Sequence, residues 1–223
     1  MAKGLKLGNG VLAAPRGAII IGIVGMVLTT AMGFVLMAVF PWTESTFSLD
    51  RFLYSLASPT QEWIAMRLQV IDEPVVVAVI LLGMGIIVLF SRGLLPALGA
   101  MVVAGFGWLA IAAVKLVVAE PRPTSFFPEL QEQALSFPSG HVVFVVALAV
   151  AVGAVVTSMT WRWILVGLLI VLALVTAWSR LYLGVHYPLD VIGGMLGGFS
   201  GAVLVLGVWN AILRRAQRSR SGS

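Results

Sequence analysis

Six runs of apolar residues, each long enough or nearly long enough to cross a membrane as a helix, restrict the fold of this chain more than any other feature. A crossing of about 30 Å needs about 20 helical residues. The chain is 60% hydrophobic with a mean hydropathy of +1.06, and a soluble domain of 223 residues could not bury that much apolar surface. The sequence therefore predicts an all-α polytopic membrane protein. The runs cover 17–40, 74–91, 93–114, 142–161, 163–178 and 191–213.

The charged residues divide unequally between the two sides of these runs. If the N-terminus is cytoplasmic, nine Lys and Arg residues and no acid fall inside, whereas all nine Asp and Glu residues fall outside. This distribution follows the positive-inside rule. It predicts a multi-pass protein of the cell (inner) membrane with cytoplasmic N- and C-termini. The net charge of +5 then reflects orientation, and no nucleic-acid partner is expected.

The stretch 41–73 between the first two runs is neither apolar enough to cross nor polar enough to be free coil. Within it, Trp63, Ile64, Leu68 and Ile71 recur at helical spacing beside polar residues. The pattern indicates a short interfacial helix in the first outer loop, where it would cover an outer-face site. An ordered connector with aromatic anchors explains the pattern equally well.

A row of small residues marks the last apolar run. Gly193, Gly197 and Gly201 repeat every four residues, a spacing that lets helix backbones approach closely. The row predicts packing inside the bundle or at a homodimer contact. We expect one domain, residues 1–223, built as a six-transmembrane helix bundle.

Three polar segments interrupt the apolar pattern on the outer side, and both histidines of the chain lie in them. Ionisable groups at the edges of membrane spans cost free energy and are candidates for function. The segments are Lys115–Pro123, Pro138–His141 and Ser179–Asp190, so the chemistry is expected in residues 115–190.

The first two segments are suited to an oxyanion. Lys115 and Arg122 are seven residues apart, so both cations can point to one side, although snorkelling to the interface would explain Lys115 alone. Ser139 is a natural N-cap, and with Gly140 it would present backbone N–H groups at the positive end of the next helix, where phosphate binds. His141 would face the same point from the first turn.

The third segment contains a histidine and a carboxylate at i and i+4. This spacing lets Asp190 reach one imidazole nitrogen of His186, which fixes the tautomer and leaves the other nitrogen free to attack. A salt-bridged helix start is the alternative. That alternative suits the pair alone but does not account for Arg180 and His141 on the same face.

Together, Lys115-x6-Arg122-Pro123, Pro138-Ser139-Gly140-His141 and Ser179-Arg180-x5-His186-x3-Asp190 resemble the three signature motifs of the type 2 phosphatidic acid phosphatase family. The resemblance implies a lipid phosphate phosphatase that needs no metal or cofactor and works through a phosphohistidine. It implies catalytic roles for His186 as nucleophile, Asp190 as its orienting partner and His141 as general acid. It also implies a phosphate-binding set, namely Lys115, Arg122, Ser139, Gly140 and Arg180.

An outer-face site would receive a headgroup while the tails remain among the membrane lipids. The chain resembles small bacterial members of the family, which slightly favours undecaprenyl pyrophosphate over phosphatidylglycerol phosphate or phosphatidate as substrate. An anion-binding transporter or channel, or a membrane scaffold, is the alternative of a different class. A vestibule, however, has no need of a His-x3-Asp pair. The family also resembles vanadium haloperoxidases in its phosphate site. Six predicted spans disfavour a peroxidase, because those enzymes look like soluble proteins.

Overall fold

The computed structural model describes residues 10–39, 58–123 and 135–221 and the single residues 52, 55, 56, 127 and 130. In these parts the regular structure is helical, and the only pairing of extended backbone is one isolated β-bridge between Pro121 and Leu135. Part of the outer segment 41–73 and several charged residues used in the topology argument lie outside the described residues. The charged residues concerned are Lys3, Lys6, Glu44, Asp50, Arg51, Glu129 and Glu132.

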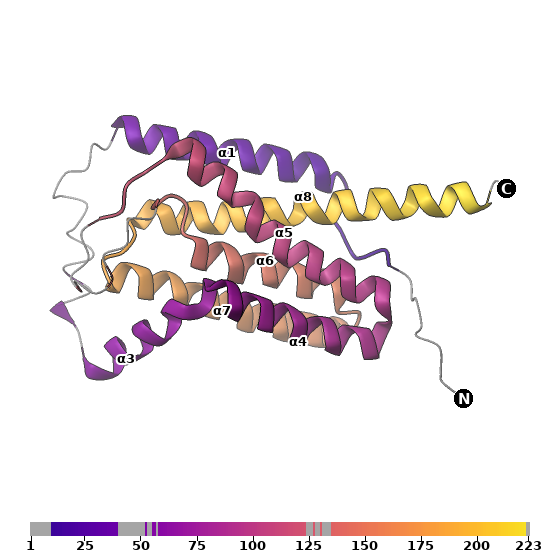
Figure 1. The fold of residues 1–223 in the computed structure, drawn as a ribbon, viewed down its shortest axis with the longest axis horizontal. Coiled ribbons are helices and arrows are strands. Elements are labelled where there is room, and N and C mark those ends of the chain that lie inside the picture. Colours follow the sequence, from indigo (N-terminus) through magenta and orange to yellow (C-terminus); the bar gives the residue numbers. More distant parts are fainter. Residues whose placement is uncertain are drawn as a thin grey trace.

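Six apolar helices lie side by side in one bundle (Figure 1). Five of them are long and apolar enough to cross a membrane, and the sixth, α6, has 16 residues. The all-α, multi-pass architecture expected from the sequence is confirmed, while a sixth crossing by α6 stays a prediction. The helices are α1 (Ala18–Val39), α4 (Pro74–Arg92), α5 (Leu94–Val118), α6 (Gly140–Val155), α7 (Met159–Tyr182) and α8 (Pro188–Ser221).

The break between the fourth and fifth apolar runs was expected at Arg162, and this expectation is wrong. α6 ends at Val155, and α7 begins at Met159 after the N-cap Ser158. Arg162 therefore lies in the first turn of α7, where its Nε donates to the carbonyl of Val156 at 2.9 Å. Because a backbone carbonyl at the end of the bundle accepts this charged donor, a lone arginine does not have to end a helix.

The central helix of the bundle is α8, which packs against α1, α5 and α6. Of its most apolar stretch 61% is buried, against 17 to 33% for the other four long helices, whose exposed apolar side chains suit contact with lipid. The glycine row faces its neighbours closely. A Cβ on Gly201 would lie 2.7 Å from the carbonyl oxygen of Gly107, and one on Gly197 would lie 2.5 Å from Ile111. The row therefore packs inside the bundle, the first of the two expected explanations.

A short helical segment covers one end of the bundle (Figure 1). It consists of α3 (Pro59–Arg67), which contacts α7, and the 3₁₀ turn η2 (Leu68–Asp72), which contacts α6 and α4. Ser58 caps α3 by accepting a hydrogen bond from the backbone N–H of Gln61 at 3.3 Å. Helical structure in the outer loop was expected, and its place in the membrane interface stays a prediction.

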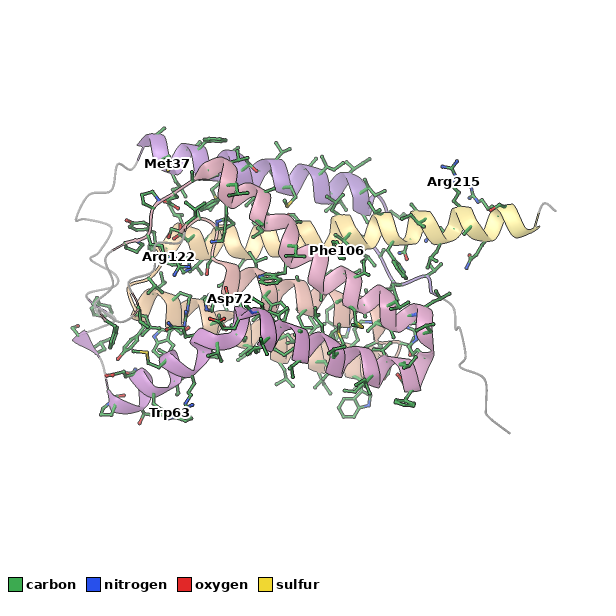
Figure 2. All side chains as sticks on the ribbon, viewed as in Figure 1. Met37, Trp63, Asp72, Phe106, Arg122 and Arg215 are labelled. Atoms are coloured by element: carbon green, nitrogen blue, oxygen red, sulfur yellow. The ribbon has the colours of Figure 1, made fainter. Side chains whose placement is uncertain are left out.

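The polar side chains gather at the two ends of the bundle. Figure 2 shows Asp72 and Arg122 at the end that α3 covers, and Arg215 at the opposite end on α8. At that opposite end Arg92 donates to the carbonyl of Val155, beside the link between α6 and α7. The chain thus presents an end with acids and bases together and an end with arginines.

We predict that the close packing around α8 is sensitive to a single methyl group. Gly201→Ala places a Cβ 2.7 Å from a backbone oxygen that cannot move without shifting α5, so it should destabilise the protein by about 1–3 kcal/mol. Gly83→Ala is the matched control, because nothing lies within 4 Å of the added Cβ. Thermal unfolding in detergent measures both variants, and equal melting temperatures would contradict this packing.

Candidate functional site

The three polar segments meet at the end of the bundle that α3 and η2 cover (Figure 2). They come from the ends of α5 and α7 and the starts of α6 and α8. A cavity of about 300 Å³ opens at this end, and three of the predicted site residues line it, from the first two segments. Its lining is Asp72, Ala112, Lys115, Leu116, Arg122, Leu135 and Gly140.

The turn between α7 and α8 holds His186. Gly184 has φ +64°, a conformation that favours glycine, and the chain reverses there within five residues. His186 is fully buried, and its Nδ1 lies 3.1 Å from Oδ2 of Asp190. The contact expected from the i, i+4 spacing is therefore confirmed. Within the described part of the chain, Nε2 of His186 has no hydrogen-bond partner.

The carboxylate of Asp190 gathers further donors around the same oxygen. Oδ2 accepts hydrogen bonds from Oγ of Ser136 at 2.5 Å and from the backbone N–H of Tyr187 at 2.8 Å. Ser136 was not predicted as a site residue. It precedes the second motif by two residues, and no spacing rule links it to Asp190, so only the tertiary fold identifies it.

The local environment keeps the His186 imidazole neutral. Its pKa is lowered to about 3, first by burial and then by the charges of Arg122 and Lys115, which together outweigh the raising effect of Asp190. A neutral imidazole whose Nδ1–H donates a hydrogen bond to a carboxylate has its lone pair on Nε2. His186 is therefore in the form that a nucleophile requires.

Lys115 and Arg122 reach the cavity from different backbone geometries. α5 ends at Val118 and is followed by Ala119 in the left-handed region, with φ +55°, so the two cations do not share one helical face. The Lys115 ammonium donates to the carbonyls of Leu135 and Ser136 at 3.0 and 3.2 Å. Both side chains nevertheless line the same cavity, as the sequence predicted.

A second cluster surrounds His141 on the first turn of α6. Its Nε2 lies 2.8 Å from the carbonyl oxygen of Gln69, 2.9 Å from Oδ1 of Asp72 and 3.1 Å from Nη1 of Arg180. Two acceptors at the shorter distances assign the proton to Nε2. Arg180 is 1% exposed and also donates to the carbonyl of Ala65 at 3.3 Å, which ties α3 to the site.

Asp72 is a site residue that the sequence did not identify. A Cβ on Gly140 would lie 2.9 Å from its Oδ2, so the carboxylate sits directly over the start of α6. Burial raises the pKa of Asp72, but the hydrogen bond and charge of His141 and the charge of Arg180 outweigh it and hold the pKa below 3.8. The only sequence signal was the expectation that the outer segment would cover a site.

The start of α6 differs in one respect from the expectation. Ser139 occupies the N-cap position, but its backbone N–H donates to the carbonyl of Asp190 at 3.0 Å and is not available to a ligand. Its hydroxyl makes no capping bond and is buried without a partner among the described residues. The groups at this point that are suited to an anion are therefore the Ser139 hydroxyl and the positive end of α6.

The arrangement is suited to the transfer of a phosphoryl group. It combines an unpartnered imidazole nitrogen, a second imidazole that carries a proton, three cationic side chains and a helix N-terminus. In the described ranges no group of three or more histidine and acidic side chains could hold a metal ion. A larger cavity of about 630 Å³ lies at the other end, away from the three polar segments, and is lined by Arg16, Asn210 and Arg214 among others.

Comparison with known proteins points to one family. The family model described as PAP2 superfamily matches residues 93–214, a range that contains all three polar segments. Over 80 residues the chain is 46% identical to the putative undecaprenyl-diphosphatase YbjG of Escherichia coli (strain K12), covering 34% of this chain and 36% of that protein. Over 82 residues it is 45% identical to an undecaprenyl-diphosphatase of Sulfolobus acidocaldarius, covering 35% and 32%. The matches thus span about a third of these relatives' own length.

A solved structure has the same fold. The PAP2-type phosphatidylglycerolphosphate phosphatase from Bacillus subtilis superposes with a TM-score of 0.67 and 19% identity. The superposition covers 87% of this chain and 96% of that one. At this level of identity the likeness concerns the fold alone, which includes the helical bundle that carries the three segments.

The position of Asp72 predicts that it competes with a bound anion. Asp72→Asn removes a negative charge from the start of α6, so orthophosphate should bind about ten-fold more tightly or better. Glu73→Gln is the matched control, because it removes the same charge from the adjacent, exposed position. Calorimetric titration of the protein in detergent measures both variants. Equal affinity in Asp72→Asn and the wild type, or an equal gain in Glu73→Gln, would contradict the placement.

Proposed function

The chain belongs to the PAP2 superfamily, and we propose that it is a membrane phosphatase that removes the terminal phosphate of a lipid phosphate or pyrophosphate through a phosphohistidine. The observation that carries this proposal is the buried pair of His186 and Asp190. Its free Nε2 lies in a site with three cations and a second imidazole, His141, whose Nε2 carries a proton. An anion channel would have no use for an oriented nucleophile, so we do not favour that alternative.

In the first step, Nε2 of His186 attacks phosphorus and the bond from phosphorus to the leaving oxygen breaks. His141, which acts in this step as the imidazolium, gives its Nε2 proton to that oxygen and is left neutral, so the lipid leaves as a neutral hydroxyl or as a monophosphate. Asp190 stabilises the positive charge that develops on the His186 ring. The equatorial phosphoryl oxygens are held by the phosphate-binding set: Lys115, Arg122, Ser139, Gly140 and Arg180.

In the second step, water attacks the phosphohistidine and the bond between phosphorus and nitrogen breaks. His141, now neutral with its lone pair on Nε2, takes the proton of the water and becomes the imidazolium again. Inorganic phosphate leaves and Nε2 of His186 regains its lone pair. Three cations and the start of α6 neutralise the phosphoryl charge in both steps, so the proposal includes no metal ion.

The favoured substrate is undecaprenyl pyrophosphate. Two relatives at 45% and 46% identity carry names that specify this activity, although the matches cover a third of their length. Leu116 supports a lipid substrate, because it lines the cavity and its side chain is 74% exposed toward the surroundings of the bundle. A headgroup could therefore enter from the side while its tail stays in the membrane. Phosphatidylglycerol phosphate and phosphatidate are the next candidates.

We predict that the purified protein releases phosphate from undecaprenyl pyrophosphate faster than from the two glycerolipids. His186→Ala should abolish release while the protein still folds in detergent, because the substitution removes the nitrogen that the proposal assigns as the acceptor of the phosphoryl group. Asp190→Asn should lower kcat by about 10³-fold or more without removing all activity, since orientation is lost before chemistry.

The controls separate the mechanism from the substrate. Orthovanadate should inhibit every productive reaction, because it resembles the pentacoordinate state of phosphorus. Full activity of His186→Ala would remove the phosphohistidine from the proposal. Inhibition by EDTA that Mg²⁺ reverses would contradict charge neutralisation by the protein alone. Release of phosphate from a glycerolipid at the highest rate would reassign the substrate but leave the chemistry in place.

The proposed setting is the outer leaflet of the cell membrane, with all six helices crossing, α3 in the interface and both termini in the cytoplasm. The distribution of charge supports it, since the described acids lie at the site end and arginines gather at the other. This orientation gives the enzyme access to lipids of the outer leaflet and releases phosphate outward.

Single cysteines in this cysteine-free chain test the orientation. Thr60→Cys lies on exposed α3 at the site end, and Ser219→Cys lies near the exposed end of α8. A membrane-impermeant maleimide added to intact cells should label Thr60→Cys and spare Ser219→Cys, and lysis should make both reactive. Labelling in the opposite order would reverse the topology and with it the leaflet of the substrate.

A further inference from the structure

Glu120 is a buried acid next to the site that the proposed mechanism does not use. Glu120 follows α5 and is only 4% exposed. The backbone is held firmly, since the carbonyl of Glu120 accepts the N–H of Ser136 at 2.7 Å and Pro121 forms a β-bridge with Leu135. The same contacts hold Ser136 against Asp190. Glu120 therefore lies beside the carboxylate that orients the nucleophile.

Two buried oxygens remain once the donors around Asp190 are assigned. Oδ2 of Asp190 accepts from His186, Ser136 and Tyr187, whereas Oδ1 accepts from none of them. Oε2 of Glu120 is likewise buried without an ordinary donor. The side chains of Glu120 and Asp190 nevertheless lie near enough to form a hydrogen bond with each other. Two carboxyl groups can do so only if one of them keeps a proton.

The surroundings determine which acid keeps the proton. Three donors on Oδ2 stabilise the ionised form of Asp190. Burial, followed by the charge and hydrogen bond of Asp190, raises the pKa of Glu120 to about 9, against the lowering effect of Lys115. The charged groups that face Glu120 are Asp190 from α8 and Lys115 from α5, with Arg122 and His186 beyond them.

An ion pair with Lys115 is the simpler explanation for a buried glutamate. The ammonium of Lys115, however, donates to the carbonyls of Leu135 and Ser136. No salt bridge between Lys115 and Glu120 is present in the part of the chain that the structure describes. The close approach of its side chain to Asp190 is thus the contact that accounts for the position of Glu120.

We propose that Glu120 is a positioning residue that stays protonated and donates a hydrogen bond to Oδ1 of Asp190, so that this carboxylate is fixed on both oxygens as it orients His186. A neutral acid supplies the fourth donor to Asp190 without adding charge to the site. When Glu120 ionises, two carboxylates face each other and Asp190 is no longer held toward the imidazole. This role in catalysis rests on the proposed function of His186, whereas the claim that Glu120 and Asp190 share a proton does not.

Thermal unfolding tests the proton without any substrate. A carboxyl whose pKa is raised from 4.5 to about 9 on folding takes up a proton, so its contribution to stability is full at low pH and is lost as pH rises through that range. Glu120→Gln keeps a donor for Asp190 but cannot ionise. The melting temperature of Glu120→Gln minus that of the wild type should therefore rise by several degrees between about pH 5 and about pH 8.

Activity tests the positioning role with the same variants. Glu120→Ala should lower kcat about ten-fold or more with little change in KM, and Glu120→Gln should restore most of the loss because its amide donates to Oδ1. The decline of kcat at alkaline pH should move to higher pH in Glu120→Gln. Ser136→Ala is the matched control, since it removes a neutral donor from Asp190 and should not change how the melting temperature depends on pH.

The outcomes separate this inference from the proposed function. If the difference in melting temperature between Glu120→Gln and wild type does not grow with pH, Glu120 does not keep a proton beside Asp190. Equal kcat values for Glu120→Gln and Glu120→Ala would overturn the positioning role. If the unfolding difference grows with pH while His186→Ala remains active, the shared proton stands and the phosphohistidine fails.

Discussion

The buried carboxylate of Asp190 is the interaction on which the site depends. Burying a charge is costly unless donors surround it, and Asp190 has His186, Ser136 and the Tyr187 amide on one oxygen. Its backbone carbonyl also accepts the N–H of Ser139 at the start of α6. One residue therefore joins the start of α8, the turn after α7, the segment before α6 and α6 itself. The donors that make the charge tolerable are the same contacts that bring the three polar segments together.

The bundle provides this interaction with a rigid frame. The glycine row lets α8 lie against α5 and α6 at backbone distance, so the first turns of α6 and α8 meet at one end. His141, on the first turn of α6, and His186, just before α8, are held in different tautomers. His186 is neutral and bonded to a carboxylate, whereas His141 directs Nε2–H toward Asp72 and Gln69. One fold thus places both histidines at the end of the bundle where Lys115 and Arg122 line a cavity.

The sequence predicted those parts of the site that follow from local geometry. The i, i+4 spacing of His186 and Asp190 and the helix start at Gly140 need only the helical repeat. Asp72, Ser136 and Glu120 could not be predicted, because their contacts depend on how η2 and the loop residues around 120 and 135–136 fold back. The boundary at Arg162 failed for a different reason. A charge at the end of a bundle can bond a carbonyl, so it does not have to mark a helix end.

A structure of the protein with orthovanadate tests the central claim most directly, since vanadate adopts the geometry of the transferring phosphoryl group. We expect vanadium bonded to Nε2 of His186, with its equatorial oxygens held by Lys115, Arg122 and Arg180. The His186 ring should stay hydrogen-bonded to Asp190 through Nδ1, and Nε2 of His141 should face the apical oxygen. Vanadate bonded to His141, or bound in the cavity without a bond to either histidine, would contradict the proposed chemistry.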